Sequence, residues 1–388
     1  MPSASALTVT PLDTPAGFGA SVEGIDLNNL SEPEFLSLQH ALYTHKVLVI
    51  RNQRDLDPRK HQDLVQRFDP KAEAVHGHGN AKEVQKTFKG KKSLVGANPP
   101  VPSAPMVRMI GRAVIPPGYH GSTEEIVLKS SSHKPIHKEP LSDEEIEKGL
   151  SRFQRWHIDA ALYRTHPPRV TALWAHKLPS GPPVRVEWDL SLPSGPQSLL
   201  TQPGRTAYLD SFALFSSLSP ADKAWVEWSE VEYAPHPFQW IQEGKMDDAG
   251  WGMASEGKET PLEELPEVEE EHVKRYRMVW PSPLTGALAL QVHAVVARRL
   301  FIRSSPDSDF KVVDDVKEVR EILYKLQKPF LKPENVLVVP QEEGDLVLWH
   351  NRGVRHTAIE YPSSGDTRIM HQIHIAGSDD PGNPVMLS

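Results

Sequence analysis

Proline is the residue that most limits how this chain can fold. The 388 residues include 36 prolines, which have no backbone N–H and are disfavoured inside helices and central strands. The hydrophobic fraction of 38% is nevertheless that of a globular protein, and a chain of this length can bury a sizeable core. The prolines therefore predict many turns and ordered loops, with few long helices, rather than disorder.

Short apolar runs bounded by turn residues recur along the chain and predict strands. They lie at 47–50, 169–178, 184–190, 205–211, 229–235, 276–281, 288–294, 335–341, 345–351 and 367–377. Apolar residues at helical spacing predict helices at 31–46, 57–68 and 314–327. This pattern predicts a mainly β fold with flanking helices, organised as a β-barrel or sandwich.

Two long segments differ in composition from the rest. Residues 77–149 are rich in Gly, Pro, Ser, Lys and His and predict long loops between short strands, whereas the Gly-rich and acidic residues 241–272 predict a solvated excursion. We expect residues 1–15 to form a tail or an edge strand. Residues 16–388 are then a single domain that carries these two loop insertions.

Charge and cysteine content exclude several classes of function. The 43 Lys and Arg against 51 Asp and Glu give a net charge of -8, which disfavours a nucleic-acid partner. The chain has no cysteine, so any metal must be bound by histidines and carboxylates. We see no signal-like start and no apolar run of membrane-spanning length, so we expect a soluble, cytoplasmic protein with no membrane partner. A homo-oligomer is compatible with this composition.

His157 and Asp159 are the first candidate metal ligands. They are separated by one residue in RWHIDAALY, so in an extended segment both side chains leave the same face. His356, which follows a strand and an Asn-Arg-Gly turn in LVLWHNRGVRHTA, is the third, and His350 on the same segment competes with it. Two imidazoles and one carboxylate leave coordination sites open, as in non-haem iron(II) oxygenases. Zinc(II) would accept the same ligands.

Arg368 is the candidate for binding a co-substrate carboxylate. It lies twelve residues after His356 and can start a strand beside the metal. 2-Oxoglutarate chelates iron through one end and leaves a second carboxylate, which a buried guanidinium matches best, while O2 takes the remaining site. In a strand, Gln372 and His374 share the face of Arg368 and would point into the same pocket. These residues together predict an Fe(II) site with 2-oxoglutarate and O2 as co-substrates.

The segments WHIDAALY, LVLWHNRGVRH and TRIMH, in this order, resemble the TauD/TfdA superfamily of Fe(II)/2-oxoglutarate-dependent dioxygenases. The resemblance implies a double-stranded β-helix core, also called a jelly roll or cupin-like fold. It also implies that His157, Asp159 and His356 bind iron, that Arg368 binds 2-oxoglutarate, and that a small molecule is oxidised with release of succinate and CO2. One departure is that LPSGPPVRVEWD offers no obvious counterpart of the threonine that touches 2-oxoglutarate in many members.

Within this superfamily the chain is most similar to the fungal xanthine dioxygenases, through RFQRWHIDAALY, VEYAPHPF, VREILYKLQ and EGDLVLWHNRGVRH. This resemblance implies hydroxylation of xanthine to uric acid, with Lys129, Glu144 and Gln372 in contact with the substrate. Met106 and His374 stand where those enzymes carry amides, which favours a changed substrate preference. For Lys129 and Glu144, an ordinary solvated loop is the alternative.

Three other functions remain open at this point. The first is a TauD-like oxygenase that hydroxylates, desaturates or cyclises an amino acid or secondary metabolite, which Met106 and His374 favour. The second is a zinc-dependent hydrolase with the same three ligands and a bound water. The third is a non-catalytic binding protein that keeps the barrel.

Overall fold

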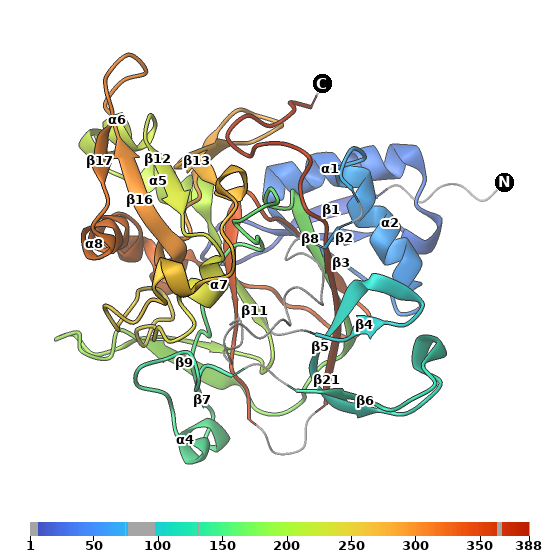
Figure 1. Cartoon of the computed structure of the whole chain (residues 1–388). Coiled ribbons are helices and arrows are strands. Elements are labelled where there is room, and N and C mark those ends of the chain that lie inside the picture. Colours follow the sequence, from blue (N-terminus) through green and yellow to red (C-terminus); the bar gives the residue numbers. More distant parts are fainter. Residues whose placement is uncertain (1–6, 74, 77–97, 130–131, 363–366, 388) are drawn as a thin grey trace.

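The computed structural model describes residues 7–73, 75–76, 98–129, 132–362 and 367–387 (Figure 1). Their fold is mixed, with more strand than helix. The helices are α1 (Glu32–His45), α2 (Pro58–Phe68), α4 (Asp143–Glu147), α5 (Ser211–Ser217), α6 (Pro220–Val226), α7 (Pro237–Trp240) and α8 (Val316–Gln327). Short 3-10 segments are η1 (Leu27–Asn29), η2 (Tyr119–Gly121), η3 (Leu262–Glu264), η4 (Glu270–His272), η5 (Ala294–Val296), η6 (Lys328–Phe330) and η7 (Pro333–Asn335).

A nine-stranded sheet runs through the molecule in the order β1-β2-β3-β19-β8-β21-β5-β4, with β6 paired to β5. Its neighbouring strands are antiparallel except for the parallel pair β2 and β3. The strands are β1 (Thr8–Pro11), β2 (Ala20–Glu23), β3 (Val47–Ile50), β4 (Pro100–Val101), β5 (Ala104–Ile115), β6 (Ile126–Leu128), β8 (Val170–Lys177), β19 (Leu346–His350) and β21 (Arg368–His374).

A second, three-stranded sheet packs against one face of the first. It has the order β18-β11-β20, with bounds Val336–Val338, Thr206–Asp210 and Val354–Ala358. We call the side of the nine-stranded sheet that meets it the inner face. The two sheets are joined by a buried apolar cluster that includes Leu173, Trp349 and Met370 from the larger sheet and Tyr208, Leu337 and Val354 from the smaller one. The candidate ligands lie on this inner side.

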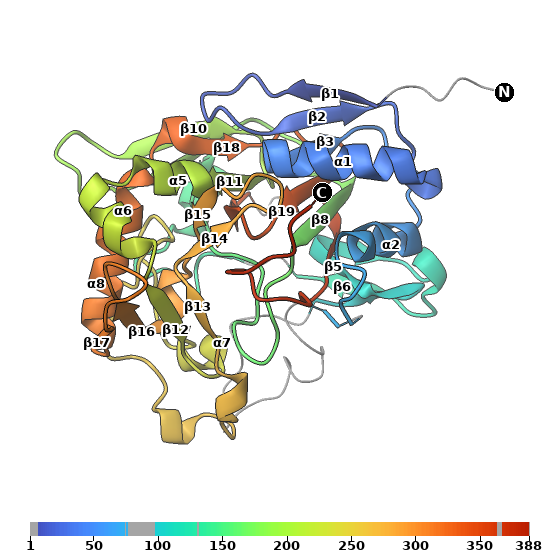
Figure 2. The ribbon, with the colours of Figure 1, turned by 90° about the horizontal axis from the view of Figure 1, so that it is seen from above.

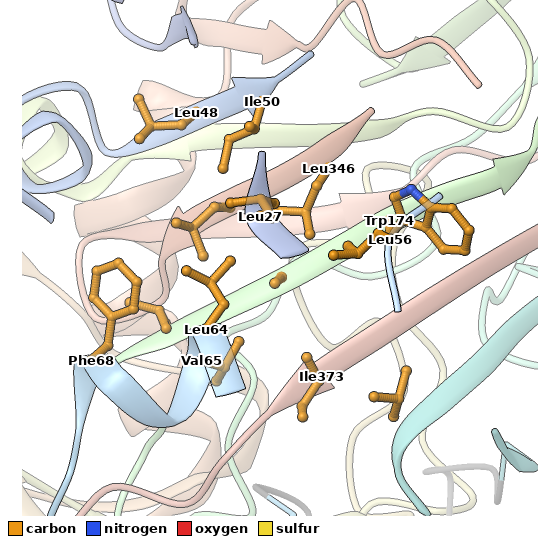
Figure 3. Packing of buried hydrophobic residues seen from close by; sticks show 14 of the residues in the cluster. Leu27, Leu48, Ile50, Leu56, Leu64, Val65, Phe68, Trp174, Leu346 and Ile373 are labelled. Atoms are coloured by element: carbon orange, nitrogen blue, oxygen red, sulfur yellow. The ribbon is translucent and has the colours of Figure 1, made fainter. Parts of the chain in front are cut away.

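The opposite side of the nine-stranded sheet, which we call the outer face, is covered by α1 and α2 (Figure 2). α1 begins as predicted, because Ser31 and Glu34 form a reciprocal capping box, and α2 begins with Pro58 in its first turn. Figure 3 shows Leu64, Val65 and Phe68 of α2 directed toward apolar side chains of the strands. This apolar layer fixes the large sheet, and with it the strands that carry the site.

Two further apolar clusters lie beside these sheets: β12 to β17 and α5 to α8 pack around one, whereas β9 and β10 pack around the other. The strands form a four-stranded sheet β13-β12-β16-β17, a three-stranded sheet β10-β9-β7 and the pair β14-β15. Their bounds are β7 (Leu150–Ser151), β9 (Val184–Trp188), β10 (Gln197–Thr201), β12 (Glu230–Tyr233), β13 (Arg275–Arg277), β14 (Val279–Pro281), β15 (Leu288–Leu290), β16 (Ala297–Ile302) and β17 (Lys311–Val313). In the described ranges, no helix is long and apolar enough to cross a membrane.

The prediction for residues 77–149 needs correction. The strand β5 within it has 12 residues, so this segment is not limited to short strands. The burial of β5 alternates along its length, but Gly111 and the intervening arginines conceal the apolar period in the sequence. The part from 77 to 97 lies outside the described residues.

Residues 241–272 match the prediction of a loop only in part. They contain no strand and only the short segments η3 and η4. Met246, Ala249 and Trp251 are nevertheless buried, so the segment packs on the protein and is not a fully solvated excursion.

Candidate active site

Two of the candidate ligands, His157 and His356, face each other across a short antiparallel bridge. The backbone N–H of each donates to the carbonyl oxygen of the other at 3.0 Å, and their ring centroids are 4.2 Å apart. His356 belongs to β20, whereas His157 lies in the irregular segment between β7 and β8. The bridge therefore brings together two imidazoles from distant parts of the sequence.

Asp159 brings a carboxylate to this pair of histidines. Its Oδ1 lies 3.8 Å from Nε2 of His157, and its Oδ2 lies 3.5 Å from Nε2 of His356. One ligand atom from each of the three residues falls within 4.8 Å of the other two. Two nitrogens and one oxygen at this spacing suit a divalent transition metal.

Hydrogen bonds hold Asp159 in place. The hydroxyl of Thr171 in β8 donates to Oδ2 of Asp159 at 2.8 Å. Asn351, which follows β19, accepts from the backbone N–H of Asp159 at 2.9 Å and donates to its carbonyl oxygen at 2.8 Å. Sequence reasoning missed both supporting residues, because nothing in their local sequence links them to Asp159.

The imidazole of His157 is kept in the form that binds metals. Burial is the main cause that lowers the pKa of His157 well below its usual 6.5, and the neighbouring His356 adds to it. Nδ1 of His157 lies 2.7 Å from the carbonyl oxygen of Arg155 and must carry the proton in order to donate to it. Nε2 is then left with a free electron pair, and it is the nitrogen that faces Asp159.

His350, the competitor for the third ligand position, is placed elsewhere. Its ring packs edge-on against Tyr43 at 4.8 Å and lies 5.9 Å from Phe212. Burial lowers the pKa of His350 to about 3, so it is a neutral, packed side chain. The grouping of ligand atoms includes His356 and not His350.

Arg368 begins β21 on the inner face and is buried. Its Nε donates to the carbonyl oxygen of Gly204 at 2.9 Å. The backbone of β5 approaches it closely, because a Cβ on Gly111, which has φ +139°, would lie 1.9 Å from the carbonyl oxygen of Arg368. Glycine is required at this position for the strand pairing that holds Arg368.

Thr206 and Tyr208 belong to β11, which pairs with the strand that carries His356. Tyr208 pairs with His356 across the two strands, and their rings stack with centroids 6.2 Å apart. Burial, with the charge of Asp159, raises the pKa of Tyr208 well above its usual value, whereas the charge of Arg368 opposes this. The Tyr208 hydroxyl therefore stays protonated and can donate a hydrogen bond, and it lies close enough to Asp159 and Arg368 for both charges to affect its pKa. Thr206 is also buried and lies two residues earlier on the same strand.

The threonine that was missing from the sequence comparison is therefore available in β11 and not in residues 178–189. Residues 205–211 read as a strand in the sequence, but nothing there connects them to Arg368. The only local signal is the alternation of Thr206 and Tyr208 in that strand, which places both side chains on one face.

Gln372 and His374 lie on the same strand as Arg368, as predicted. His374 is completely buried, its ring is 4.3 Å from that of His76, and its Nε2 is 3.8 Å from Oδ1 of Asp159. Gln372 is half-buried and pairs with Leu173 of β8. Met106, near the start of β5, is half-buried and packs against the apolar cluster of the outer face.

Lys129 and Glu144 lie on the surface. Lys129 follows β6 and is exposed. Glu144 is in α4, where its side chain is 77% exposed and forms an ion pair with Nζ of Lys148 at 2.6 Å. This setting agrees with the solvated-loop alternative, and their contact with a substrate stays a prediction.

The arrangement defines a class of protein: a metal-dependent oxygenase with two histidines, one carboxylate and a buried arginine for an acidic co-substrate. A family model described as "Taurine catabolism dioxygenase TauD, TfdA family" matches residues 8–374. The chain belongs to this family of 2-oxoglutarate-dependent dioxygenases. It is an oxidoreductase that uses Fe(II) and 2-oxoglutarate and acts on a small molecule.

Curated relatives match over nearly the whole chain. Alpha-ketoglutarate, which appears in their names, is another name for 2-oxoglutarate. An alpha-ketoglutarate-dependent xanthine dioxygenase of Neurospora crassa is 40% identical over 97% of this chain and 88% of its own length. An alpha-ketoglutarate-dependent xanthine dioxygenase of Emericella nidulans is 40% identical over 96% of this chain and 98% of its own length. An alpha-ketoglutarate-dependent dioxygenase of Alternaria brassicicola is 33% identical over 97% of this chain and 94% of its own length.

Solved structures with the same fold are more distant in sequence. A putative alpha-ketoglutarate-dependent taurine dioxygenase from Burkholderia xenovorans superimposes with a TM-score of 0.55 and 17% identity, over 98% of this chain and 93% of its own. A crystal structure of AAD-2 in complex with Mn(II) and N-oxalylglycine superimposes with a TM-score of 0.54 and 17% identity, over 97% of this chain and 99% of its own.

Proposed function

We propose that this dioxygenase hydroxylates xanthine to uric acid, with iron bound by His157, Asp159 and His356 and 2-oxoglutarate bound by Arg368. The grouping of these three ligand atoms within 4.8 Å is the observation that carries the metal assignment. The substrate assignment rests on the 40% identity to xanthine dioxygenases over almost the full chain.

The residues present fit an iron(II) ion. Nε2 of each histidine is directed toward the Asp159 carboxylate, whose Oδ2 accepts from Thr171. Neutral imidazole nitrogens with a single carboxylate hold a labile divalent metal, and membership of the family favours iron over a hydrolytic zinc centre.

The roles of the neighbouring residues follow from their positions. Arg368 would bind the distal carboxylate of 2-oxoglutarate, and the hydroxyls of Thr206 and Tyr208 would donate to it. Once bound, iron and 2-oxoglutarate supply the oxidising chemistry, with release of succinate and CO2. The protein positions the substrate and excludes water, and Gln372 and His374 line the side of the pocket formed by β21.

We also propose that the two facing sheets form a double-stranded β-helix within a single domain spanning 16–388. The packing of the three-stranded sheet on the inner face of the nine-stranded one supports this. Strand β1 (Thr8–Pro11) then adds an edge strand ahead of that domain.

A second candidate function is oxidation of a secondary metabolite by the same metal centre. The imidazole of His374, 3.8 Å from Asp159, stands where the xanthine dioxygenases are expected to carry an amide. An amide offers a donor and an acceptor side by side, whereas the two nitrogens of an imidazole lie at different edges of the ring, so the hydrogen bonds offered to a purine differ.

The test is succinate formation by anaerobically purified protein supplied with Fe(II), ascorbate, O2 and 2-oxoglutarate, with and without xanthine. His157→Ala is the control. Xanthine-stimulated succinate with an equal amount of uric acid supports the proposal. Iron-dependent succinate that xanthine does not stimulate keeps the dioxygenase and rejects this substrate, and would favour the second candidate.

A further inference from the structure

Arg155 is an arginine beside the candidate metal ligands that the proposed mechanism has not used. It precedes His157 by two residues, and its carbonyl oxygen accepts from Nδ1 of His157 at 2.7 Å. Its backbone N–H donates to the hydroxyl of Thr357, the residue after His356, at 3.0 Å. Both contacts tie Arg155 to the two histidines. Its positive charge is among the causes that lower the pKa of His157, after burial and His356.

Two of the three guanidinium nitrogens of Arg155, Nε and Nη1, are buried without a hydrogen-bond partner among the described residues. The nearest recorded contact of the cation is the ring of Phe238, whose centroid is 5.4 Å away. Burial lowers the pKa of Arg155 to about 10, so the group stays charged at neutral pH.

Three other buried arginines have hydrogen-bonded or ion-paired guanidinium groups, although Nε of Arg320 and of Arg355 has no partner among the described residues. Arg352 forms an ion pair with Asp379 at 2.8 Å and donates to the carbonyl oxygen of Pro167, and Arg320 is paired with Glu259. Arg355 donates to the carbonyl oxygen of Val292. A desolvated charge without such partners destabilises the folded state, which makes the unpaired Arg155 an unusual feature for a purely structural residue.

Arg155 and His157 each keep some accessible surface, whereas the residue between them and the residue after them do not. Arg155 as a whole residue is half-buried, although its Nε and Nη1 are buried, and the side chain of His157 is 24% exposed. Trp156 and Ile158 are only 2% and 1% exposed. Bridges of Phe153 to Ile359 and of His157 to His356 run this segment alongside β20, so the alternate residues Arg155 and His157 point to the same side of it.

We infer that Arg155 binds an anionic, planar group of the primary substrate beside the iron ligands. The five donors of a guanidinium lie in one plane, so they match two adjacent acceptors, such as the two oxygens of a carboxylate or a carbonyl oxygen next to an ionised ring nitrogen. Xanthine offers the second arrangement when one of its acidic N–H groups ionises. The inference rests on the proposed function, and it makes Arg155 a substrate-binding residue distinct from Arg368.

The decisive variants are Arg155→Gln, which keeps polarity without charge, and Arg155→Lys, which keeps the charge without the planar fork. Arg164→Gln is the matched control, because Arg164 is on the same segment but pairs with the exposed Glu269. Each protein is loaded anaerobically with Mn(II) and N-oxalylglycine, a 2-oxoglutarate analogue, and titrated with xanthine by calorimetry.

We expect Arg155→Gln to weaken xanthine binding by about 30-fold or more, within the range for a charge-assisted pair, and Arg155→Lys to fall between it and the parent protein. Binding of N-oxalylglycine should change by less than about threefold in both, which also establishes that the variants are folded. Xanthine affinity that is unchanged in Arg155→Gln overturns the inference. A parallel loss of N-oxalylglycine affinity overturns it too, because the guanidinium would then serve the co-substrate or the fold.

A second readout separates this inference from the identity of the substrate. Nitrate is a planar anion, and with N-oxalylglycine present the Arg368 position is already taken. Nitrate should raise the thermal midpoint of the parent protein and of Arg164→Gln, and should not raise that of Arg155→Gln. Failure to bind xanthine together with this nitrate effect rejects the substrate and supports the Arg155 site. An equal nitrate effect in all three proteins rejects the site.

Discussion

The two faces of β21 carry histidines in contrasting surroundings. On the inner face, Nε2 of His374 lies 3.8 Å from the carboxylate of Asp159. On the outer face, Nε2 of His371 forms a hydrogen bond of 2.9 Å with the hydroxyl of Tyr119, and its ring lies near His120, His176 and Trp174. The two histidines are three residues apart and equally buried.

The difference shows that burial and clustering of histidines do not by themselves define a metal centre. Burial, with the neighbouring histidines, lowers the pKa of His371 well below its usual value, just as burial lowers that of His157. In the described residues, only the inner group brings two of these imidazoles within ligand distance of a buried carboxylate. The carboxylate of Asp159, held by Thr171 and Asn351, is what separates a site of chemistry from a packed aromatic cluster.

The largest expected effect is the loss of a proposed ligand from the inner group. His356→Ala should abolish stoichiometric iron binding and lower iron-dependent succinate formation by more than about 100-fold, because removing a ligand should cost more than removing a residue that supports one. His371→Gln on the outer face should keep the iron. Iron content by elemental analysis and succinate formation measure both. Equal iron loss in the two variants would mean that the distinction between the faces is wrong.

The parts of the fold that depend on local sequence could be predicted. The helices at 31–46 and 57–68 and the strand at 47–50 were predicted from adjacent residues, and the structure confirms them as α1, α2 and β3. The length of strand β5 was predicted too short, because β5 is held as a strand by its pairing with β21 as much as by its own residues.

The residues of the candidate site likewise divide into those that the sequence could predict and those that it could not. His157 and Asp159 were visible because their spacing is local, and His356 and Arg368 because the order of motifs resembles a known family. Thr171 and Asn351 were not, because their bonds to Asp159 join residues 12 and 192 positions apart and arise only when the strands pair. Arg155 could not be singled out from sequence, since nothing there shows which arginines find a partner.

A smaller effect is expected from the residue that supports the inner carboxylate. Thr171→Val keeps the shape of the side chain but cannot donate to Oδ2 of Asp159, so metal affinity should fall by about 10- to 100-fold. Thr165→Val is the matched control, because the hydroxyl of Thr165 is buried without a hydrogen-bond partner. Competition with a chelator measures the affinity. A loss of less than about twofold in Thr171→Val would mean that this bond does not position the ligand.

The histidines on the outer face should affect the pH dependence of the stability and not the activity. The pKa values of His371, His120 and His176 are all lowered in the folded protein, mainly by burial, and His61 also faces His371. The unfolded chain therefore binds more protons below about pH 6.5, and the free energy of unfolding should fall as the pH drops from there.

His371→Gln removes one of these groups, so that decline should become shallower by about 1 kcal/mol per pH unit. Urea unfolding of iron-free protein between pH 5 and 7.5 measures it, so that metal release does not contribute. His40→Gln, on the exposed side of α1, is the control for replacing a histidine at the surface. A slope that is the same in His371→Gln and the parent protein would show that His371 does not differ in protonation between the folded and unfolded states.

The smallest effect is expected at Glu144, which tests whether substrate recognition extends beyond the inner face. Its side chain is 77% exposed and paired with Lys148 within one helical turn, and such surface pairs contribute about 0 to 1 kcal/mol. Glu144→Gln should therefore leave both stability and the KM for xanthine nearly unchanged, whereas Gln372→Ala in the pocket should raise that KM. Steady-state kinetics of uric acid formation compares the two. An increase of tenfold or more in KM for Glu144→Gln would mean that α4 reaches the substrate during turnover, and recognition would then involve the surface loop as well as β21.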